Sequence, residues 1–461
     1  MAQRFDAIVI GTGQSGPSLA VRLAKSGRKT AVIERAAFGG TCVNVGCTPT
    51  KAYVACARAA HVVRHAADFG VQAGGEVRVD LAFVKARKDR IIGASREGVE
   101  RWLRAKPNVT VFQGHARFSA PHAVSVAAAG GEVLALEAPK IFLNTGTRAL
   151  VPAIPGIERV RYETNTTILA LETLPSHLAI VGGSYVALEF AQMFRRFGSR
   201  DTVLVRSTRV LAREDEDVAR AMQDVLAREG IEFRFGTSPR AVEPAGEGGV
   251  GVALEDGSFD ASHLLRATGR IPNTDDLGLD AAGITRDRRE LIPVDGQLRT
   301  NVEGVWALGD VNGRGAFTHT SYDDVQIVAA NLLDGASRSA DTRIPAYAVF
   351  VDPPLARVGL SEREVRESGR PALISTMPMS RVGRARERGE TDGFMKALVD
   401  AQTQRILGAS IFGIEGDEAI HTFIDTMAAG APYTTLQFAM HIHPTVSELV
   451  PTLLDGLRPL Q

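Results

Sequence analysis

The sequence has few cysteines and no excess of charge of either sign. Three cysteines in 461 residues are too few for a secreted scaffold held by disulfides, so we expect a cytoplasmic protein in a reducing environment. The 53 Lys and Arg residues balance the 53 Asp and Glu residues, which gives a formal net charge of zero and a pI near 7.2. Such a chain offers no basic field for a nucleic acid or for an anionic membrane surface, and we expect neither partner.

Long apolar runs are also missing. No stretch has the roughly 20 apolar residues of a membrane helix, and an apolar strand that begins by Phe5 leaves no room for a signal peptide. A content of 44% hydrophobic and 23% charged residues is ordinary for a soluble globular protein. The length of 461 residues predicts two to four domains, each with its own core.

The chain begins with a pattern typical of nucleotide binding. The apolar run 5–10 leads into Gly11-Thr12-Gly13-Gln14-Ser15-Gly16, and residues 17–26 have a helical pattern. The next apolar run, 30–33, is followed by Glu34, at the offset where a carboxylate meets the ribose of a bound dinucleotide. A glycine turn alone often marks only a tight turn. Strand, turn, helix and acid together predict a dinucleotide-binding unit with the pyrophosphate at the helix N-terminus.

Two of the cysteines, Cys42 and Cys47, lie five residues apart just after this unit. Residues five apart on a regular helix point roughly 140° away from each other, so a disulfide between them needs a distorted turn, for which Gly46 and Pro49 are suited. A strained, accessible disulfide is labile, and Lys51, one helical turn after Cys47, would favour the thiolate. The pattern predicts a redox-active dithiol. The alternatives are two inert buried thiols or a zinc site, although no third ligand lies close by.

The following segments predict the surroundings of that unit. Residues 52–105 are expected to form long helices, with Asp80 as an N-cap and Cys56 as a thiol in a helix core. Residues 108–118 and 122–137 alternate like strands, and 140–146 return to a buried strand. Pro152 and Pro155-Gly156 indicate a linker.

A second, imperfect nucleotide unit follows the linker. The apolar run 177–181 leads into Gly182-Gly183-Ser184-Tyr185 and a helix that should end at Gly198, but Ser184 stands where the second glycine is expected. The next strand, 202–205, is followed by Arg206-Ser207-Thr208, where an NAD site would carry an acid. An arginine with two hydroxyls suits a 2′-phosphate, and Arg213 could add a second cation, so the loop predicts NADPH. The alternative is a solvated surface arginine.

The last third of the chain changes in pattern. The runs 346–351, 394–400 and 406–412 are strand-like, and the chain ends in helices. In the final helix the apolar residues form one stripe: Val446, Leu449, Val450, Leu453, Leu454 and Leu457. Before it, Thr445 and Glu448 fit a capping box, and a histidine at a helix start, here His443, is usually only solvated.

The run from Gly39 to Lys51 resembles the active-site signature of the class I pyridine nucleotide–disulfide oxidoreductases, such as dihydrolipoamide dehydrogenase, glutathione reductase and mercuric reductase. Residues 265–273, 300–310 and 441–448 match further motifs of that family. The resemblance implies an α/β fold of two Rossmann-like domains, for FAD and NADP, with a C-terminal α+β dimerisation domain. The expected division is 1–150 and 274–342 for FAD, 151–273 for NADP and 343–461 for the dimer interface.

The resemblance also implies the cofactor contacts. Asp310 matches the aspartate that binds the ribityl chain of FAD, Thr318 would begin a helix near the flavin ring, and Tyr185 matches a tyrosine that covers the nicotinamide pocket. The FAD positions that it implies are Gly11, Gly13, Gly16, Glu34, Thr41, Lys51, Gly146, Asp310 and Thr318. The NADPH positions are Gly182, Ser184, Tyr185, Glu189, Arg206, Ser207, Thr208, Arg213 and Gly269.

By the same resemblance, Cys47 is the sulfur beside the flavin and Cys42 is the outer sulfur that meets the electron acceptor. Glu189 pairs with Lys51 at the flavin. His443, oriented by Glu448, exchanges protons with a substrate thiol. This histidine would serve the dithiol of the other subunit, so we expect a homodimer with a shared active site.

The electron acceptor is the open point of the sequence analysis. The loop 182–189 and the Arg-Ser-Thr run look like mercuric reductase, but Cys56 is the last cysteine of the sequence, so the C-terminal cysteine pair that delivers Hg(II) is missing. We expect a small disulfide or a thiol-bound metal ion such as Hg(II) or Cu(II), with quinones also open. The alternatives are a dihydrolipoamide dehydrogenase activity and a flavin-binding redox sensor without turnover.

Overall fold

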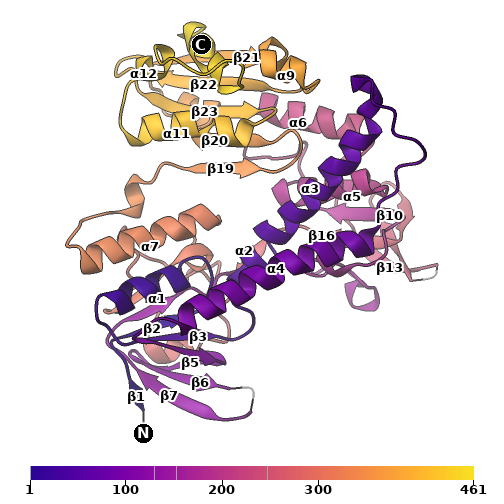
Figure 1. Ribbon diagram of the computed structural model, residues 1–461. Coiled ribbons are helices and arrows are strands. Elements are labelled where there is room, and N and C mark those ends of the chain that lie inside the picture. The colour runs from indigo at the N-terminus through magenta and orange to yellow at the C-terminus, as the bar shows by residue number, and fades with distance from the viewer. Residues whose placement is uncertain (1, 129, 152, 247, 461) are drawn as a thin grey trace.

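A computed structural model describes residues 2–460 except 129, 152 and 247, so the linker residue Pro152 lies outside the described residues. Figure 1 shows two α/β units joined by long helices, with the C-terminal sheet at the end of the molecule away from the N-terminus. The fold is α/β, with two Rossmann-like nucleotide units followed by a C-terminal α+β domain.

The first nucleotide unit is a parallel five-stranded sheet in the order β18-β8-β2-β3-β4. Its strands are β2 (Ala7–Ile10), β3 (Thr30–Glu34), β4 (Val109–Gln113), β8 (Ile141–Leu143) and β18 (Val305–Ala307). The central strands are apolar and fully buried because helices α1 (Gly16–Lys25) and α7 (Thr318–Leu333) pack over the sheet. Since β18 pairs with β8, the chain returns to this sheet after completing the second unit.

Three helices follow β3: α2 (Gly40–Asn44), α3 (Cys47–Arg64) and α4 (Leu81–Arg104). The predicted break between the cysteines lies at Val45 and Gly46, whereas Pro49 lies in the first turn of α3, where its missing N–H costs no helical hydrogen bond. Asp80 caps α4 as predicted, since its Oδ1 accepts the Phe83 N–H at 3.0 Å. In Figure 1, α3 and α4 run from the first unit to the second.

Smaller sheets complete this half of the molecule. A four-stranded sheet has the order β1-β7-β6-β5, and β9 pairs with β17. The bounds are β1 (Gln3–Arg4), β5 (His115–Ala120), β6 (Ala123–Ala127), β7 (Val133–Glu137), β9 (Thr147–Ala149) and β17 (Arg270–Pro272).

The second nucleotide unit is a parallel sheet in the order β12-β11-β10-β16 with an antiparallel meander, β13-β14-β15, beside it. Helix α5 ends at Gly198 as predicted, because this glycine adopts the left-handed conformation at φ 119°. The bounds are β10 (His177–Val181), α5 (Tyr185–Phe197), β11 (Arg200–Val205), α6 (Glu216–Arg228), β12 (Glu232–Phe235), β13 (Ala241–Ala245), β14 (Gly249–Ala253), β15 (Ser258–Ala261) and β16 (His263–Arg266).

The C-terminal domain is a six-stranded antiparallel sheet in the order β19-β20-β23-β22-β21-β24 with short helices around it. The strands are β19 (Ala346–Val349), β20 (Leu355–Gly359), β21 (Ala372–Pro378), β22 (Phe394–Asp400), β23 (Ile406–Phe412) and β24 (Arg458–Pro459). The helices are α8 (Glu362–Glu367), α9 (Gly383–Glu387), α10 (Gly416–Ala419), α11 (His421–Ala428), α12 (Thr434–Gln437) and α13 (Val450–Asp455).

The predicted final helix is shorter than expected. A 3₁₀ turn (Ser447–Leu449) precedes α13, so the apolar stripe spans two short pieces instead of one long helix. The stripe still packs into the core: Val446, Val450, Leu453 and Leu454 are buried, and Leu449 and Leu457 are partly covered. Burial of the apolar face, and not the length of the helix, was the reliable part of that prediction.

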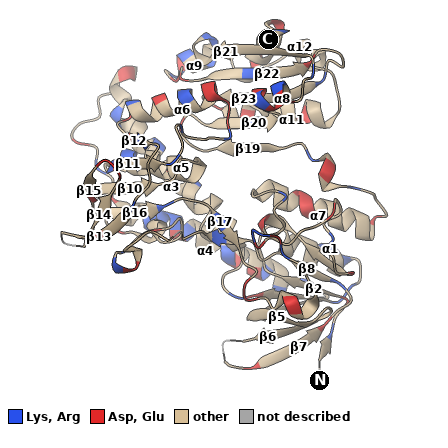
Figure 2. Cartoon of the chain, turned by 180° about the vertical axis from the view of Figure 1, so that it is seen from behind, with Lys and Arg blue, Asp and Glu red and all other residues tan. Residues whose placement is uncertain are grey.

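Charge is spread over the molecule. Figure 2 shows Lys and Arg interspersed with Asp and Glu along the chain. No helix in the described part of the chain combines the length and the apolar character that crossing a bilayer demands.

Candidate active site

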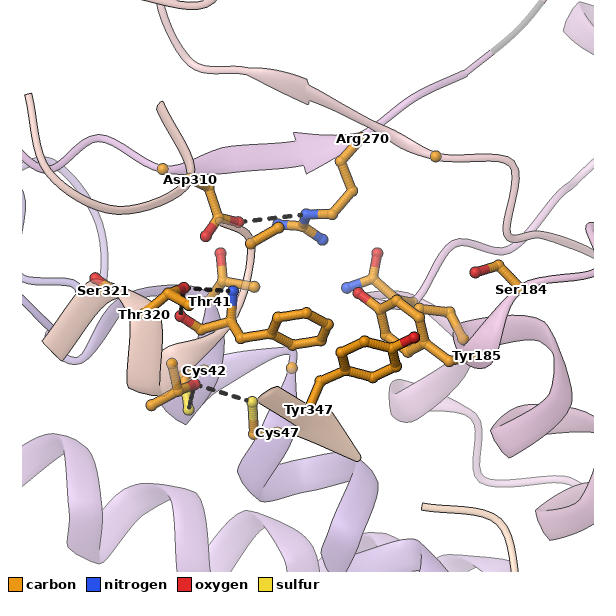
Figure 3. Close-up of a pocket in the computed structure, with 18 of the residues that line it drawn as sticks. Thr41, Cys42, Cys47, Ser184, Tyr185, Arg270, Asp310, Thr320, Ser321 and Tyr347 are labelled. Carbon is orange, nitrogen blue, oxygen red and sulfur yellow. Dashed lines mark hydrogen bonds and ion pairs between the residues drawn. The ribbon is translucent and has the colours of Figure 1, made fainter. Parts of the chain in front are cut away.

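The site lies in a cavity of about 2410 Å³ that both nucleotide units and the C-terminal domain line (Figure 3). Both cysteines and the two glycine turns meet in this cavity. The predicted residues that line it are Gly11, Gly13, Glu34, Thr41, Cys42, Cys47, Lys51, Gly146, Gly182, Ser184, Tyr185, Glu189, Arg206, Ser207, Arg213, Gly269, Asp310 and Thr318. Gly16, Thr208, His443 and Glu448 do not line it.

The first glycine turn is packed tightly against Asn144, which follows β8. A Cβ on Gly11, at φ 98°, would lie 2.3 Å from the Asn144 carbonyl oxygen, and one on Gly13 would lie 2.8 Å from its Oδ1. Asn144 also accepts the Gly16 N–H at 3.0 Å and donates to the Leu308 carbonyl at 3.1 Å. Only glycine fits these approaches, so Asn144 fixes the turn against the sheet.

Gly16 has a packing role in this structure. Its Cβ would lie 2.1 Å from the Gly11 carbonyl oxygen, so the glycine lets α1 start directly against the turn. This matches the third glycine of the fingerprint, which serves helix–strand packing. Glu34 is buried at the end of β3, where its Oε2 accepts the Thr12 hydroxyl at 2.6 Å and the Thr12 N–H at 3.0 Å.

Asp310 lies on the opposite wall, just after β18. Its Oδ2 accepts the Thr147 hydroxyl at 2.8 Å and lies 3.9 Å from the Arg270 Nε (Figure 3). Thr147 and Arg270 belong to β9 and β17, so the small two-stranded sheet places the carboxylate.

The two sulfurs are free thiols in contact with each other, where the sequence predicted a pair able to form a disulfide. The Thr318 hydroxyl, at the start of α7, donates to Cys42 Sγ at 3.1 Å and contacts Cys47 Sγ at 3.3 Å. The pKa of Cys47 falls to about 6, first because Cys42 hydrogen-bonds to it and then because of Thr318 and the charge of Lys51. The pKa of Cys42 rises, first because its thiol donates a hydrogen bond to Cys47 and then because the Cys42 side chain is buried.

Cys47 is also the first residue of α3, and a helix N-terminus favours a thiolate. Lys51 favours the thiolate, as its position in the sequence predicted, but it lowers the pKa of Cys47 less than Cys42 and Thr318 do. The Lys51 Nζ lies 2.9 Å from Glu189 Oε2 and 4.5 Å from the centroid of the Phe350 ring. Glu189 Oε1 accepts the Phe350 N–H at 2.9 Å, so α3, α5 and the end of β19 meet at this ion pair.

The second glycine turn faces the same thiols. Ser184 is the N-cap of α5, and Tyr185 begins the helix with its ring 6.0 Å from that of Phe317. Phe317 stacks on Tyr347 at 5.4 Å with an angle of 4° between the rings. Figure 3 shows Tyr185 and Tyr347 on the side of the cavity that holds Cys47. A planar ring is the ligand that such an aromatic wall suits.

The loop after β11 carries the predicted phosphate-binding residues. Arg206 and Arg213 are exposed at the cavity wall, whereas Ser207 donates its hydroxyl to the Arg209 carbonyl at 2.7 Å. Thr208 is exposed outside the cavity lining.

His443 and Glu448 lie together in the C-terminal domain. His443 Nδ1 is 2.7 Å from Glu448 Oε2; the histidine side chain is 80% exposed and the carboxylate 13%. Thr445 Oγ1 accepts the Glu448 N–H at 3.3 Å, so half of the predicted capping box forms. The carboxylate of Glu448 hydrogen-bonds the His443 ring instead of a backbone N–H at the start of the helix.

Comparison with known proteins identifies the family. The chain belongs to the pyridine nucleotide-disulphide oxidoreductase family: the family model matches residues 5–325, and that of its dimerisation domain matches residues 345–454. It is therefore an oxidoreductase that uses FAD and NAD(P)H and forms a homodimer.

Relatives match over nearly the whole chain. The probable pyridine nucleotide-disulfide oxidoreductase RclA of Escherichia coli is 38% identical over 96% of this chain and 97% of its own. Dihydrolipoyl dehydrogenase of Chlamydia muridarum is 32% identical over 97% and 96%. Mercuric reductase of Streptomyces lividans is 34% identical over 96% and 94%. The solved Cu(II) complex of the HOCl-induced flavoprotein disulfide reductase RclA from E. coli superposes with a TM-score of 0.91 at 36% identity, covering 99% of both chains.

The donor set suits FAD. The glycine turn at the start of α1 suits the pyrophosphate, the carboxylate of Glu34 suits the ribose and that of Asp310 suits the ribityl chain, and all three line the same cavity. Residues that the sequence analysis missed include Asn144, Phe317 and Tyr347. Their only local signals are their positions beside Thr145-Gly146, beside Thr318 and in an apolar strand run.

Proposed function

We propose that the chain carries electrons from NADPH through FAD to the Cys42–Cys47 pair, and from there to a small disulfide or a thiol-bound metal ion. The observation that carries the proposal is the thiol pair itself. The pKa of Cys47 is lowered to about 6 and Thr318 bridges both sulfurs, in the cavity that contains both glycine turns.

Each residue has a distinct role in this proposal. Bound FAD supplies the two-electron link between NADPH and the protein sulfurs. Cys47, kept as a thiolate by Cys42, Thr318 and Lys51, is the inner sulfur. Cys42 keeps its proton and is the outer sulfur, which must lose that proton before it attacks.

The disulfide step balances as two exchanges. Cys42, deprotonated by His443 of the partner subunit, attacks one sulfur of the substrate and forms a mixed disulfide, and the leaving thiolate takes the proton back from the imidazolium. The Cys47 thiolate then attacks Cys42 Sγ, which restores the Cys42–Cys47 disulfide and releases the second substrate sulfur as a thiolate that takes a proton from solvent. One disulfide thus becomes two thiols, and the protein loses the two electrons it had received.

The metal-ion branch uses the same sulfurs. The similar proteins include a mercuric reductase and a disulfide reductase solved as a Cu(II) complex, which supports a thiol-bound metal ion as an acceptor. One Hg(II) or two Cu(II) ions would take the same two electrons. A dihydrolipoyl dehydrogenase activity is less favoured, because Arg206 stands where an NAD-linked enzyme would carry an acid.

The test is NADPH oxidation by the purified holoenzyme with oxidised lipoamide, glutathione disulfide, hydroxyethyl disulfide, Hg(II), Cu(II) and a quinone. We expect turnover with a disulfide or a metal ion, and its loss in Cys42→Ser and Cys47→Ser. Cys42→Ser should also show the long-wavelength band of a thiolate beside oxidised flavin without reduction, whereas Cys47→Ser should lack it. Turnover that survives in Cys42→Ser would refute the dithiol route. No turnover with any acceptor would support the redox-sensor alternative.

A further inference from the structure

The loop 441–448 presents the His443–Glu448 pair from the surface of the C-terminal domain. The His443 side chain is 80% exposed and neighbours exposed apolar residues, with Met440 98% and Ile442 79% exposed. A proton-transfer group must meet its partner at hydrogen-bond distance, and a misplacement of about 1 Å can cost roughly 100-fold in rate. An exposed loop with this task needs a rigid support.

Most hydrogen bonds of the loop are internal. His441 Nδ1 lies 2.7 Å from the Ser447 carbonyl oxygen, and the Thr445 hydroxyl donates to the Ile442 carbonyl at 2.7 Å. These bonds set the shape of the loop but do not connect it to the rest of the domain. The side chain of Val446 is buried in the domain, and it anchors the end of the loop but not its middle.

Arg384 supplies the connection from a neighbouring element. Among side chains outside the loop in the described part of the chain, that of Arg384 hydrogen-bonds the backbone next to His443. Its Nη2 and Nε donate to the Pro444 carbonyl at 2.7 and 3.3 Å. The Nη1 lies 3.2 Å from Glu387 Oε2, which holds the far side of the guanidinium. A planar fork on one carbonyl fixes both its distance and its direction.

The element that carries Arg384 is itself fixed. Helix α9 packs into the core of the C-terminal domain through Ala385, and Val382, just before the helix, is buried in the same core. Gly383 stands beside Glu448, since a Cβ there would lie 4.0 Å from Glu448 Oε1. The same short helix therefore lies against the carboxylate that orients the histidine and bonds the carbonyl that follows it.

We propose that Arg384 is the positioning residue of His443: by holding the Pro444 carbonyl on α9, it fixes the imidazole in the direction of the partner's dithiol. The inference rests on the proposed function, in which His443 is the proton-transfer group. Arg384 itself does not touch the reacting sulfurs.

The experiment separates the two half-reactions. Arg384→Met keeps the aliphatic stem and removes the donors, Arg384→Lys restores a single donor, and Arg386→Met removes an exposed arginine from the same helix as a control. Stopped-flow measurements follow flavin reduction by NADPH, and reoxidation of the two-electron-reduced holoenzyme by hydroxyethyl disulfide. Arg384→Met should slow reoxidation about 10-fold to 100-fold and leave flavin reduction within about twofold of wild type. Arg384→Lys should recover part of the loss, and Arg386→Met should match wild type.

The outcomes distinguish this inference from the proposed function. Wild-type reoxidation in Arg384→Met, together with slow reoxidation in His443→Ala, would overturn the inference and leave the proposed function standing. Normal reoxidation in His443→Ala would overturn the role of the histidine itself. Equal slowing of both half-reactions in Arg384→Met and Arg384→Lys would also overturn the inference, because it would indicate general damage to the fold.

A mixed dimer adds an independent readout. In a heterodimer of Arg384→Met and Cys42→Ser, the intact dithiol of the first chain faces the intact Arg384 and His443 of the second. Its single working site should react at the wild-type rate. A rate as slow as that of the Arg384→Met homodimer would contradict the inference.

Discussion

At the scale of single residues, Thr318 has one hydroxyl proton for two sulfurs. The hydroxyl lies 3.1 Å from Cys42 Sγ and 3.3 Å from Cys47 Sγ, and its hydrogen bond helps to lower the pKa of Cys47 to about 6. Thr318→Val keeps the shape of the side chain and removes this donor, so the pKa of Cys47 should rise. In the two-electron-reduced holoenzyme, the long-wavelength thiolate band should then disappear at a higher pH on acidification than in wild type. Thr318→Ser keeps the donor and serves as the control; equal midpoints for Val and Ser would contradict the role.

Asp201 is an acidic residue whose surroundings disfavour the ionised carboxylate. It is fully buried in β11, and in the described structure neither of its oxygens has a hydrogen-bond partner. Burial raises the pKa of its carboxyl to about 8, against a smaller opposite effect of the charge of Arg195. The folded state therefore holds its proton more tightly than the unfolded state, so the stability falls as the pH rises from about 4 to about 8 and then levels off.

Replacing this carboxyl should stabilise the protein. Asp201→Val suits a buried strand position and should raise the stability at neutral pH by about 1–3 kcal/mol, with the gain in melting temperature widening between pH 5.5 and 8. Asp256→Asn, at an exposed position, is the control and should follow the wild-type curve. A gain that does not change with pH would mean that Asp201 is not protonated in the fold.

At the scale of elements, the loop between β11 and α6 is hydrogen-bonded to the second glycine turn and to the C-terminal sheet. Leu211, at the unusual φ of 45°, donates its N–H to the Gly183 carbonyl at 2.7 Å. Glu214, further along, accepts Arg357 Nη1 at 2.9 Å and the Tyr347 hydroxyl from the C-terminal sheet. The loop is thus fixed against both the second glycine turn and the aromatic wall, while Arg206 stays exposed at the cavity.

This arrangement makes cofactor preference testable at Arg206. A charge-assisted contact with the 2′-phosphate is worth about 1.5–3 kcal/mol, which is roughly a 10-fold to 100-fold preference for NADPH. Arg206→Glu should invert the preference, because a carboxylate repels the phosphate and can bind ribose hydroxyls. The measurement is kcat/KM for both nucleotides, with Arg240→Glu, an exposed arginine outside the cavity, as the control. Equal kcat/KM values for NADH and NADPH in the wild-type protein would refute the assignment.

At the scale of the whole molecule, the proposed proton-transfer pair and the thiols of one chain do not line the same cavity. His443 and Glu448 lie outside the lining of the cavity that contains Cys42 and Cys47. The family's dimerisation domain covers residues 345–454 and therefore includes both. We infer that each active site is completed by the second subunit.

Subunit exchange checks this arrangement. The Cys42→Ser and His443→Ala homodimers should each be nearly inactive in disulfide reduction, since loss of a general base typically costs about 10²–10⁴ in rate. After mixing under conditions that exchange subunits, each heterodimer should regain one intact site. If mass measurements confirm the exchange and no activity returns, the base acts within its own chain or has no catalytic role.

The local sequence predicted the elements whose pattern depends on near neighbours. The strand–turn–helix of the first unit, the Asp80 cap and the glycine stop at Gly198 could be predicted because turn chemistry and apolar periodicity act over a few residues. The two cysteines could be identified because their run is long and specific. The length of the last helix could not, because packing of its apolar stripe decided where the backbone turned into a 3₁₀ segment.

The sequence by itself therefore determined the class of the fold, the thiol pair and the two nucleotide loops, all of which are encoded in contiguous residues. Only the tertiary structure decided how the thiols are tuned. Thr318 follows Cys47 by 271 residues, and Asn144 follows Gly16 by 128, yet each pair lies within hydrogen-bond distance. Such contacts arise because β18 returns to the first sheet and brings α7 over the glycine turn, and no local pattern encodes that return.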